Sequence, residues 1–299
     1  MTRTTATSSL ERPVPAMVRR TRLARRGRQV KEVLKYLVAI LGVLIAITPY
    51  LYMVLQSVAP WSEVDRRAIP SEVTLRSYEW LLKGSRTVAP KPWLRALFNS
   101  ALVSVSSTVL MVVTALVVAY ALSRLRFRGQ KVIYNVILFQ MFYPAIIILV
   151  PTFLIVRALG LYNTYWGMII PKAVNLWAIF MYTSFFKSIQ QEIIDAARID
   201  GLSELGIVFR VVLPVSVPIT SVITLFLFME RWSELLWDLI IIQEEGLMTL
   251  NVLIATMSGP YGNYPGGLYA ASVILTLPIL ILFLIFSKYF RQGFQLVLK

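Results

Sequence analysis

Long apolar stretches separated by shorter polar segments dominate this chain. Six of the stretches approach or exceed the roughly 20 residues that a helix needs to cross about 30 Å of hydrocarbon. Helices are expected there, because unpaired backbone groups are costly in lipid. The pattern predicts an all-α polytopic membrane protein with six transmembrane helices, at residues 34–58, 96–122, 132–156, 166–186, 211–229 and 268–287.

The distribution of Lys and Arg predicts how the spans are oriented. Most of these residues fall in the segments on one side of the predicted spans, starting with the N-terminal tail. Basic residues mark the cytoplasmic side, so both termini are expected in the cytoplasm. Residues 1–32 are expected to form an Arg-rich, disordered cytoplasmic tail that contacts anionic lipid headgroups. Residues 33–299 are expected to form the transmembrane domain.

One polar segment interrupts the apolar second half, and it is also expected in the cytoplasm. Its core, DAARIDG at residues 195–201, is typical of a short amphipathic helix that ends at Gly201, where a positive φ lets the chain turn. The small side chains of Ala196 and Ala197 allow a partner to approach closely. Such a helix either docks into a partner protein or simply joins two spans.

The same segment resembles the EAA loop of the permeases of ABC importers, E-A-A-x-x-D-G-A followed by L-P-x-x-x-P. Asp195, Ala196, Ala197, Asp200 and Gly201 match the first part. The second part is matched at residues 213–218. Asp195 replaces a glutamate and is one methylene shorter, whereas Leu202 adds bulk in place of an alanine.

Further motifs resemble the carbohydrate, maltose-type branch of this family. Phe142-Tyr143-Pro144 and Pro151 match a pattern of prolines in the third span, and residues 159–171, LGLYNTYWGMIIP, match the turn that follows. Near residue 232 the family has W-N-[DE]-F-x-x-P-L, which Trp232, Glu234 and Leu239 match. Ser233 replaces the Asn of this motif and Asp238 replaces its Pro. Proline residues bend helices, and bent helices can enclose a cavity for a polar solute.

The resemblance implies a type I ABC-importer permease fold and a set of partners. These are a second homologous permease, two cytoplasmic ABC ATPases, an extracytoplasmic binding protein or lipoprotein, and a sugar-like substrate. It places the chain in a bacterial or archaeal cytoplasmic membrane, in contact with lipids. The loop at 188–213 would couple the ATPases to transport through Asp195, Ala196, Ala197, Asp200, Gly201 and Leu202.

The composition limits the kinds of catalysis and ligand binding that this chain can perform. The chain is 57% apolar and has neither Cys nor His, so thiolate and His-based catalysis are excluded. The phosphate-binding motif G-x-x-x-x-G-K-[ST] is absent from the sequence. We therefore expect no enzyme activity, no cofactor and no metal in this chain, with ATP and Mg bound by the partner ATPases. The net charge of +15 reflects membrane orientation, and no nucleic-acid partner is expected.

Polar residues at membrane depth are candidates for the translocation path, because they should face protein or water. At the end of the fifth span, Arg231 is expected to pair with Glu234, three residues later, leaving Glu230 and Asp238 for solvent or partners. The long side chain of Lys172 can reach the membrane interface. The candidates are Gln140, Tyr143, Asn175, Glu230, Trp232 and Glu234.

Three alternatives stay open from the sequence. The acidic residues near the fifth span also suit a proton- or sodium-coupled secondary transporter. A membrane scaffold that binds an ATPase without moving a solute is the second alternative. An ABC-importer permease for a non-sugar solute is the third, since no single residue specifies the solute.

Overall fold

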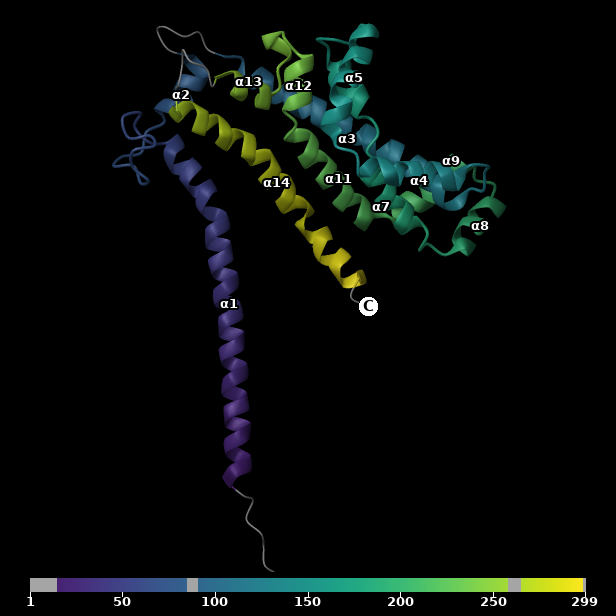
Figure 1. Ribbon diagram of the computed structural model, residues 1–299, viewed down its shortest axis with the longest axis horizontal. Coiled ribbons are helices and arrows are strands. Elements are labelled where there is room, and N and C mark those ends of the chain that lie inside the picture. Colours follow the sequence, from purple (N-terminus) through teal and green to yellow (C-terminus); the bar gives the residue numbers. More distant parts are fainter. Residues whose placement is uncertain (1–14, 85–90, 258–264, 298–299) are drawn as a thin grey trace, which may run out of the picture. The chain divides into compact units, whose positions relative to one another are not determined.

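The computed structural model describes residues 15–84, 91–257 and 265–297 of the chain. The elements within these ranges are helices, and the described chain falls into two compact units, residues 1–54 and 55–299. Figure 1 traces the helices along the sequence.

The first unit consists of most of one long helix, α1 (Pro15–Ser57). Its second part, Lys31–Ser57, is long and apolar enough to cross a membrane, as the sequence predicted for the first span. The backbone is already helical from Pro15, inside the segment expected to be a disordered tail. Arg, Leu and Ala are good helix formers, which favours this continuation. Residues 1–14 of the predicted tail lie outside the described residues.

In the second unit two further helices meet the length and composition of a membrane span: α3 (Trp93–Arg124) and, within α14 (Pro265–Val297), the segment Gly266–Phe286. The other apolar stretches form three bent pairs of helices. If each bent pair counts as one span, the described chain has up to six by length and composition. The all-α, multi-span fold is therefore confirmed.

The predicted third span is not one continuous helix. It is divided into α4 (Gln130–Met141) and α5 (Ala145–Ala158), which are bent by 108°. Pro144 lies at the break with an extended backbone, φ −62° and ψ 123°. Proline has no N–H to donate and disfavours a helical residue before it, so the helix ends at this point. Pro151 leaves α5 intact.

The fourth stretch also bends, by 40°, between a first part made of α6 (Tyr165–Ile169) and a short 3₁₀ turn, η1 (Ile170–Lys172), and a second part, α7 (Leu176–Phe186). Asn175 begins α7, because its side-chain oxygen accepts a hydrogen bond from the Ala178 N–H at 2.9 Å. This is the usual action of an Asn at a helix N-cap.

The fifth stretch bends by 91° at Ser216, before α11 (Val217–Trp232). The segment ahead of the bend comprises α9 (Glu204–Ile207), a π-helical turn η2 (Val208–Val212) and α10 (Leu213–Val215). Prolines at 214 and 218 flank the bend. The remaining helices are α2 (Arg76–Lys83), α8 (Gln191–Ile199), α12 (Leu236–Ile241), η3 (Glu245–Leu247) and α13 (Leu250–Met257).

Helix α3 contributes to all three hydrophobic clusters of the second unit. One cluster joins it to α7, α8 and η2, another to α2, α13 and α14, and the third to α6 and α12. Ala115 and Ala119, one turn apart on α3, are fully buried, as is Ala178 on α7. Small residues let helices pack closely where lipid gives no hydrophobic driving force between them. The unit is therefore built around α3.

Candidate functional site

The coupling segment forms the short helix that the sequence predicts. In α8, Asp200 is the C-cap, and Gly201 follows with a left-handed φ of +82°. The Gly201 N–H donates to the Arg198 carbonyl at 3.0 Å, and the Leu202 N–H donates to the Ala197 carbonyl at 3.1 Å. These two bonds make a Schellman motif, which satisfies carbonyls at the helix end. Glycine is favoured here because an L side chain is strained at this φ.

The helix α8 has one buried and one exposed face. Ile194 and Ala197 are buried in the cluster around α3, whereas Glu192, Ala196 and Ile199 are exposed. The spacing of the exposed residues, four and then three, places them on one side of the helix. Ile199 is 86% exposed. Ala196 is therefore open to a partner, whereas Ala197 packs inward against the cluster around α3.

Asp195 is tied to its own helix. Its Oδ1 accepts hydrogen bonds from Gln191 at 3.0 Å and from Arg198 at 3.1 Å. It stands in the middle of α8, and the acidic residue in the first turn is Glu192. Asp195 therefore has no role in starting the helix.

Contacts with Glu204 and α3 hold this loop in place, and sequence reasoning missed them. Arg198 binds the Glu204 carboxylate with two nitrogens, at 2.9 and 3.2 Å. The Tyr120 hydroxyl donates to Glu204 at 2.5 Å. The hydrogen bond to Glu204 raises the pKa of the Arg198 guanidinium above its ordinary value. Tyr120 is 84 residues from Glu204, so local spacing gave no signal of this pair.

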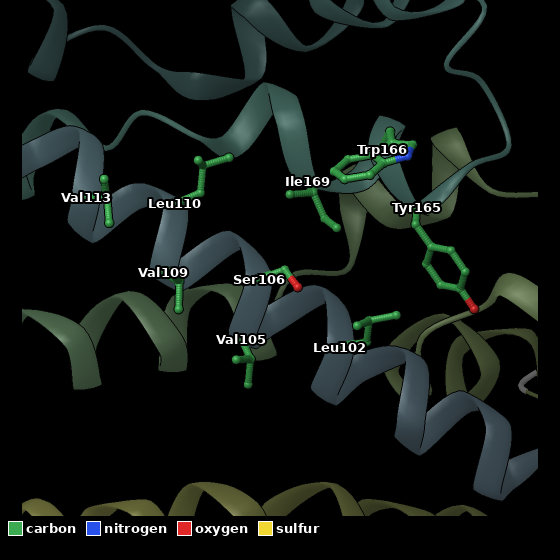
Figure 2. Close-up of a pocket in the computed structure, with 9 residues that line it drawn as sticks. All are labelled: Leu102, Val105, Ser106, Val109, Leu110, Val113, Tyr165, Trp166 and Ile169. Carbon is green, nitrogen blue, oxygen red and sulfur yellow. The ribbon is translucent and has the colours of Figure 1, made fainter.

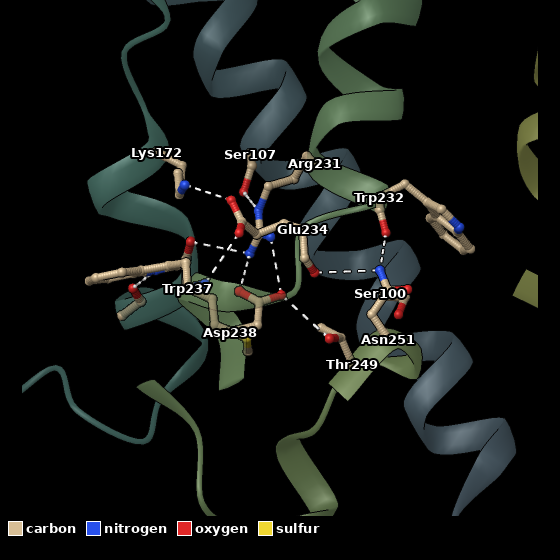
Figure 3. A network of polar contacts seen from close by, with 12 residues as sticks. Ser100, Ser107, Lys172, Arg231, Trp232, Glu234, Trp237, Asp238, Thr249 and Asn251 are labelled. Carbon is tan, nitrogen blue, oxygen red and sulfur yellow. Dashed lines mark hydrogen bonds and ion pairs between the residues drawn. The ribbon is translucent and has the colours of Figure 1, made fainter. Parts of the chain in front are cut away.

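A second site lies where α11 ends, and Figure 3 shows two of its ion pairs, Lys172–Glu234 and Arg231–Asp238. Lys172 Nζ lies 2.6 Å from Glu234 Oε2, and the Asn175 amide donates to Glu230 at 3.2 Å. The side chains of Lys172 and Glu234 are 36% and 20% exposed. Lys172 thus pairs with Glu234 instead of reaching for the interface alone. We call these four residues the polar cluster.

The expected Arg231–Glu234 pair is wrong. Arg231 binds Asp238 instead, at 2.7 and 3.1 Å, and both side chains are only 2% exposed. Helix α11 ends at Trp232 with Ser233 as its cap, so Glu234 is no longer on the helix and the three-residue spacing does not bring it to Arg231.

Groups from other helices complete the bonding of this buried pair. Ser107 of α3 accepts from Arg231 Nε at 3.4 Å, and Thr249 donates to Asp238 at 3.4 Å. The Met168 carbonyl accepts from Arg231 at 3.4 Å. A buried ion pair is stable only when its remaining donors and acceptors also find partners. Asp238 is thus part of the structural core of this region.

The other candidates for the path divide between two environments. Trp232 is 3% exposed, stacks on Phe228, and donates its indole N–H to the Leu275 carbonyl at 3.0 Å. Its side chain therefore packs in the protein. Gln140 and Tyr143 are exposed near the α4–α5 break, and within the described residues neither side chain forms a hydrogen bond with the polar cluster. The structure brings together Asn175, Glu230 and Glu234, along with Lys172.

Figure 2 shows a separate cavity between α3 and α6. Its lining is mainly apolar, and the Tyr165 hydroxyl at its edge donates to Asn99 at 2.7 Å. Polar solutes are bound by convergent polar groups, which the polar cluster supplies and this lining does not. The lining residues are Leu102, Val105, Ser106, Val109, Leu110, Val113, Tyr165, Trp166 and Ile169.

The fold defines a multi-pass helical membrane protein, with a polar loop around α8 and a polar cluster between its helices. Residues 111–295 match the family described as "Binding-protein-dependent transport system inner membrane component". The chain belongs to this family of importer permeases, which confirms the resemblance read from the sequence.

Individual relatives cover most of the chain. It is 33% identical over 254 residues to the arabinooligosaccharides transport system permease protein AraQ of Halalkalibacterium halodurans, covering 83% of this chain and 89% of that protein. It is 32% identical to the trehalose transport system permease protein SugB of Mycobacterium tuberculosis, covering 83% and 90%.

A solved structure agrees in fold. It is the crystal structure of a bacterial ABC transporter that imports the acidic polysaccharide alginate. The likeness has a TM-score of 0.78 and 25% identity, and it covers 89% of this chain and 98% of that chain.

Proposed function

We propose that this chain forms half of the translocation pathway for a carbohydrate in an ATP-driven importer. Disaccharides, oligosaccharides and related polyol or glycerol-phosphate solutes are the class we expect. The two relatives named above, permease proteins of arabinooligosaccharide and trehalose transport systems, support this class. A similar permease would supply the other half of the pathway.

The observation that carries the proposal is the coupling loop. Its helix is rigidly closed at Gly201, packs one face against α3 and leaves Ala196 and Ile199 exposed. A small apolar face flanked by charged residues suits a groove on a cytoplasmic ATPase. Two such ATPases would bind ATP and Mg and close together, and the loop would pass that motion to the membrane helices.

In this mechanism the pathway alternates between outward-facing and inward-facing states. ATP and the loaded external binding protein must each bind the outward-facing state more tightly, because a ligand shifts an equilibrium only by its difference in affinity for the two states. Sugar hydroxyls would meet the amide and carboxylates of Asn175, Glu230 and Glu234. Carboxylates and amides are suitable partners for hydroxyl groups.

The structure argues against an ion-coupled secondary transporter, for which Asp238 was one basis. Asp238 is buried and paired with Arg231, and Glu234 is paired with Lys172. These two carboxylates already have cationic partners within the protein. A coupling ion needs an accessible carboxylate that it can bind and from which it can dissociate. The ATP-driven mechanism therefore fits better.

Co-purification from native membranes tests the assembly. The tagged chain is solubilised in a gentle detergent, and the proteins recovered with it are identified by mass spectrometry. We expect a second permease, an ATPase and an external binding protein or lipoprotein. Recovery of the chain alone, in a detergent that preserves a known ABC importer, contradicts the proposal.

The polar cluster is tested in the purified complex by replacing Asn175 with Ser, which keeps an N-cap oxygen for α7, and Glu230 with Gln. We expect uptake of the transported sugar to fall about tenfold for each, the loss of roughly one hydrogen bond to a charged or polar group. Subunit recovery should be unchanged. A control, Thr152→Ala, alters an exposed hydroxyl that bonds only to its own helix. Unchanged uptake in both cluster variants removes these residues from the pathway.

A further inference from the structure

We propose that Tyr120, Arg124 and Glu204 are positioning residues that fasten the coupling helix α8 to α3, so that α3 carries motion from the coupling loop to the polar cluster. This inference rests on the proposed function, because it explains how the loop acts on the pathway. Two sets of hydrogen bonds at one end of α3, called the two ties below, support it. So do the contacts that α3 makes further along its length.

The first tie is Arg124, the last residue of α3. Its guanidinium donates to the backbone carbonyls of Phe186 and Ile189, and to the side chain of Gln191 at 2.8 Å. These residues form the end of α7, the turn after it and the first position of α8. The guanidinium thus joins three consecutive parts of the chain to α3. Hydrogen bonds from a charged donor are stronger than neutral ones.

The second tie lies one helical turn earlier on α3. Tyr120 and Arg124 are four residues apart, so they share a face of the helix. The Tyr120 hydroxyl binds Glu204 at 2.5 Å, Glu204 binds Arg198 with both carboxylate oxygens, and Arg198 binds Asp195. The two ties therefore hold α8 at both of its ends, the start through Gln191 and the last turn through Arg198.

Further along, α3 contacts the pathway region. Ser107 bonds to Arg231, next to Glu230, and the Thr114 hydroxyl donates to the Ala173 carbonyl at 2.6 Å, between Lys172 and Asn175. From Ser107 to Arg124 is about 26 Å along a helix that rises 1.5 Å per residue. Helix α3 therefore reaches from the coupling loop to both sides of the polar cluster.

Motion could also pass from the coupling loop to the polar cluster along the backbone, but both backbone connections contain a bend. Between the coupling loop and Glu230 the chain bends by 91° at Ser216, and between α7 and Lys172 it bends by 40°. Helix α3 is continuous over 32 residues. An unbroken helix moves as a rigid element, whereas a bend without a complete set of helical hydrogen bonds absorbs displacement. The uninterrupted element is thus the better carrier of motion.

The test uses the whole complex, purified through a tag on this chain and placed in proteoliposomes. Glu204→Gln and Tyr120→Phe remove bonds of the second tie, and Arg124→Gln removes most of the first. Ser188→Ala is the matched control, because this hydroxyl lies in the same turn but bonds only to the nearby Phe185 carbonyl. We expect about tenfold less sugar uptake per ATP hydrolysed in the three variants, with all subunits recovered, and no change in the control.

A distance measurement provides a readout that does not depend on the solute. The chain has no cysteine, so Ser123→Cys and Gln190→Cys give it two unique spin-label sites, on α3 and at the start of α8. Any cysteines of the partner subunits are replaced before labelling. We expect the same distance between the labels in nucleotide-free and vanadate-trapped complexes. In the Glu204→Gln background the distance distribution should broaden or shift between these states.

Two results overturn the inference: a distance that changes with nucleotide in the otherwise unaltered chain, or wild-type uptake per ATP in all three variants. Tyr120→Phe removes only one hydroxyl, so it keeps the test valid if the other variants do not assemble. A complex that hydrolyses ATP but moves none of a panel of disaccharides, oligosaccharides, polyols and glycerol-phosphate derivatives contradicts the proposed carbohydrate function, while the spin-label distance still tests the tie.

Discussion

At the scale of single residues, charge pairing in the second unit is specific. Glu234 binds Lys172, Asp238 binds Arg231, and Glu230 accepts from Asn175. Each acidic side chain has its own partner on another segment or another turn. The buried Arg231–Asp238 pair is the most demanding of these, since an unpaired charge in an apolar region is costly. We therefore assign it to the stability of the region.

Replacement of Arg231 by Met should destabilise the protein by about 3–5 kcal/mol, because it leaves the Asp238 carboxylate buried without its partner. The measurement is the thermal unfolding of the purified chain in detergent, along with its amount in the membrane. The double variant Arg231→Met/Asp238→Leu should recover much of the loss. A single variant that unfolds at the wild-type temperature contradicts this assignment.

Gly201 is the second residue with a specific prediction. In Gly201→Asp a negative charge would stand beside Asp200 at the C-terminal end of α8, where the helix dipole is negative. We expect the chain to insert into the membrane but uptake to become uncoupled from ATP hydrolysis. Gly201→Asn is the control, because Asn also accepts a left-handed backbone without adding charge. Normal, ATP-coupled uptake by Gly201→Asp would contradict this prediction.

The sequence predicted local features well and distant ones poorly. The end of α8 at Gly201 and the bend near Pro144 follow from the conformations that glycine and proline allow. The Tyr120–Glu204 and Lys172–Glu234 contacts join residues 84 and 62 positions apart. No spacing rule reaches that far. The Arg231–Glu234 prediction failed because it assumed that α11 continued past Trp232, and Ser233 ends it.

At the scale of elements, helix α8 has one face that packs within the protein and an opposite face that is exposed. Ile194 and Ala197 are buried against the cluster that includes α3, and the opposite face carries Ala196 and Ile199. A large apolar side chain that is 86% exposed contributes little to the stability of the chain alone. The exposed face is thus free to contribute to binding a partner.

Replacing Ile199 with Ser should leave the stability of this chain within about 0.5 kcal/mol, as for most exposed positions. It should reduce recovery of the ATPase in the co-purification. The matched control is Ile69→Ser, an isoleucine that is 74% exposed in the segment before α2. Equal ATPase recovery from both variants contradicts the docking face, while poor folding of Ile199→Ser contradicts the assignment of that side chain to the surface.

At the scale of the whole molecule, the second unit is organised by α3. This helix supplies residues to the three hydrophobic clusters, binds the coupling loop through Tyr120 and Arg124, and contacts the buried ion pair through Ser107. The hydropathy pattern gave its position and length closely. The hydropathy pattern gave no sign that α3 lies at the centre of the packing of this unit. That position depends on which helices pack against α3 and not on the sequence of α3 itself.

The central claim is that ATP drives a sugar through this chain and its partner permease. The most direct measurement is uptake of labelled arabinotriose, trehalose or lactose into proteoliposomes that contain the purified complex, with the external binding protein added. The account predicts uptake of at least one of these sugars that requires ATP on the ATPase side and persists when ionophores abolish proton and sodium gradients. Uptake without ATP that collapses with the ion gradients would contradict the account.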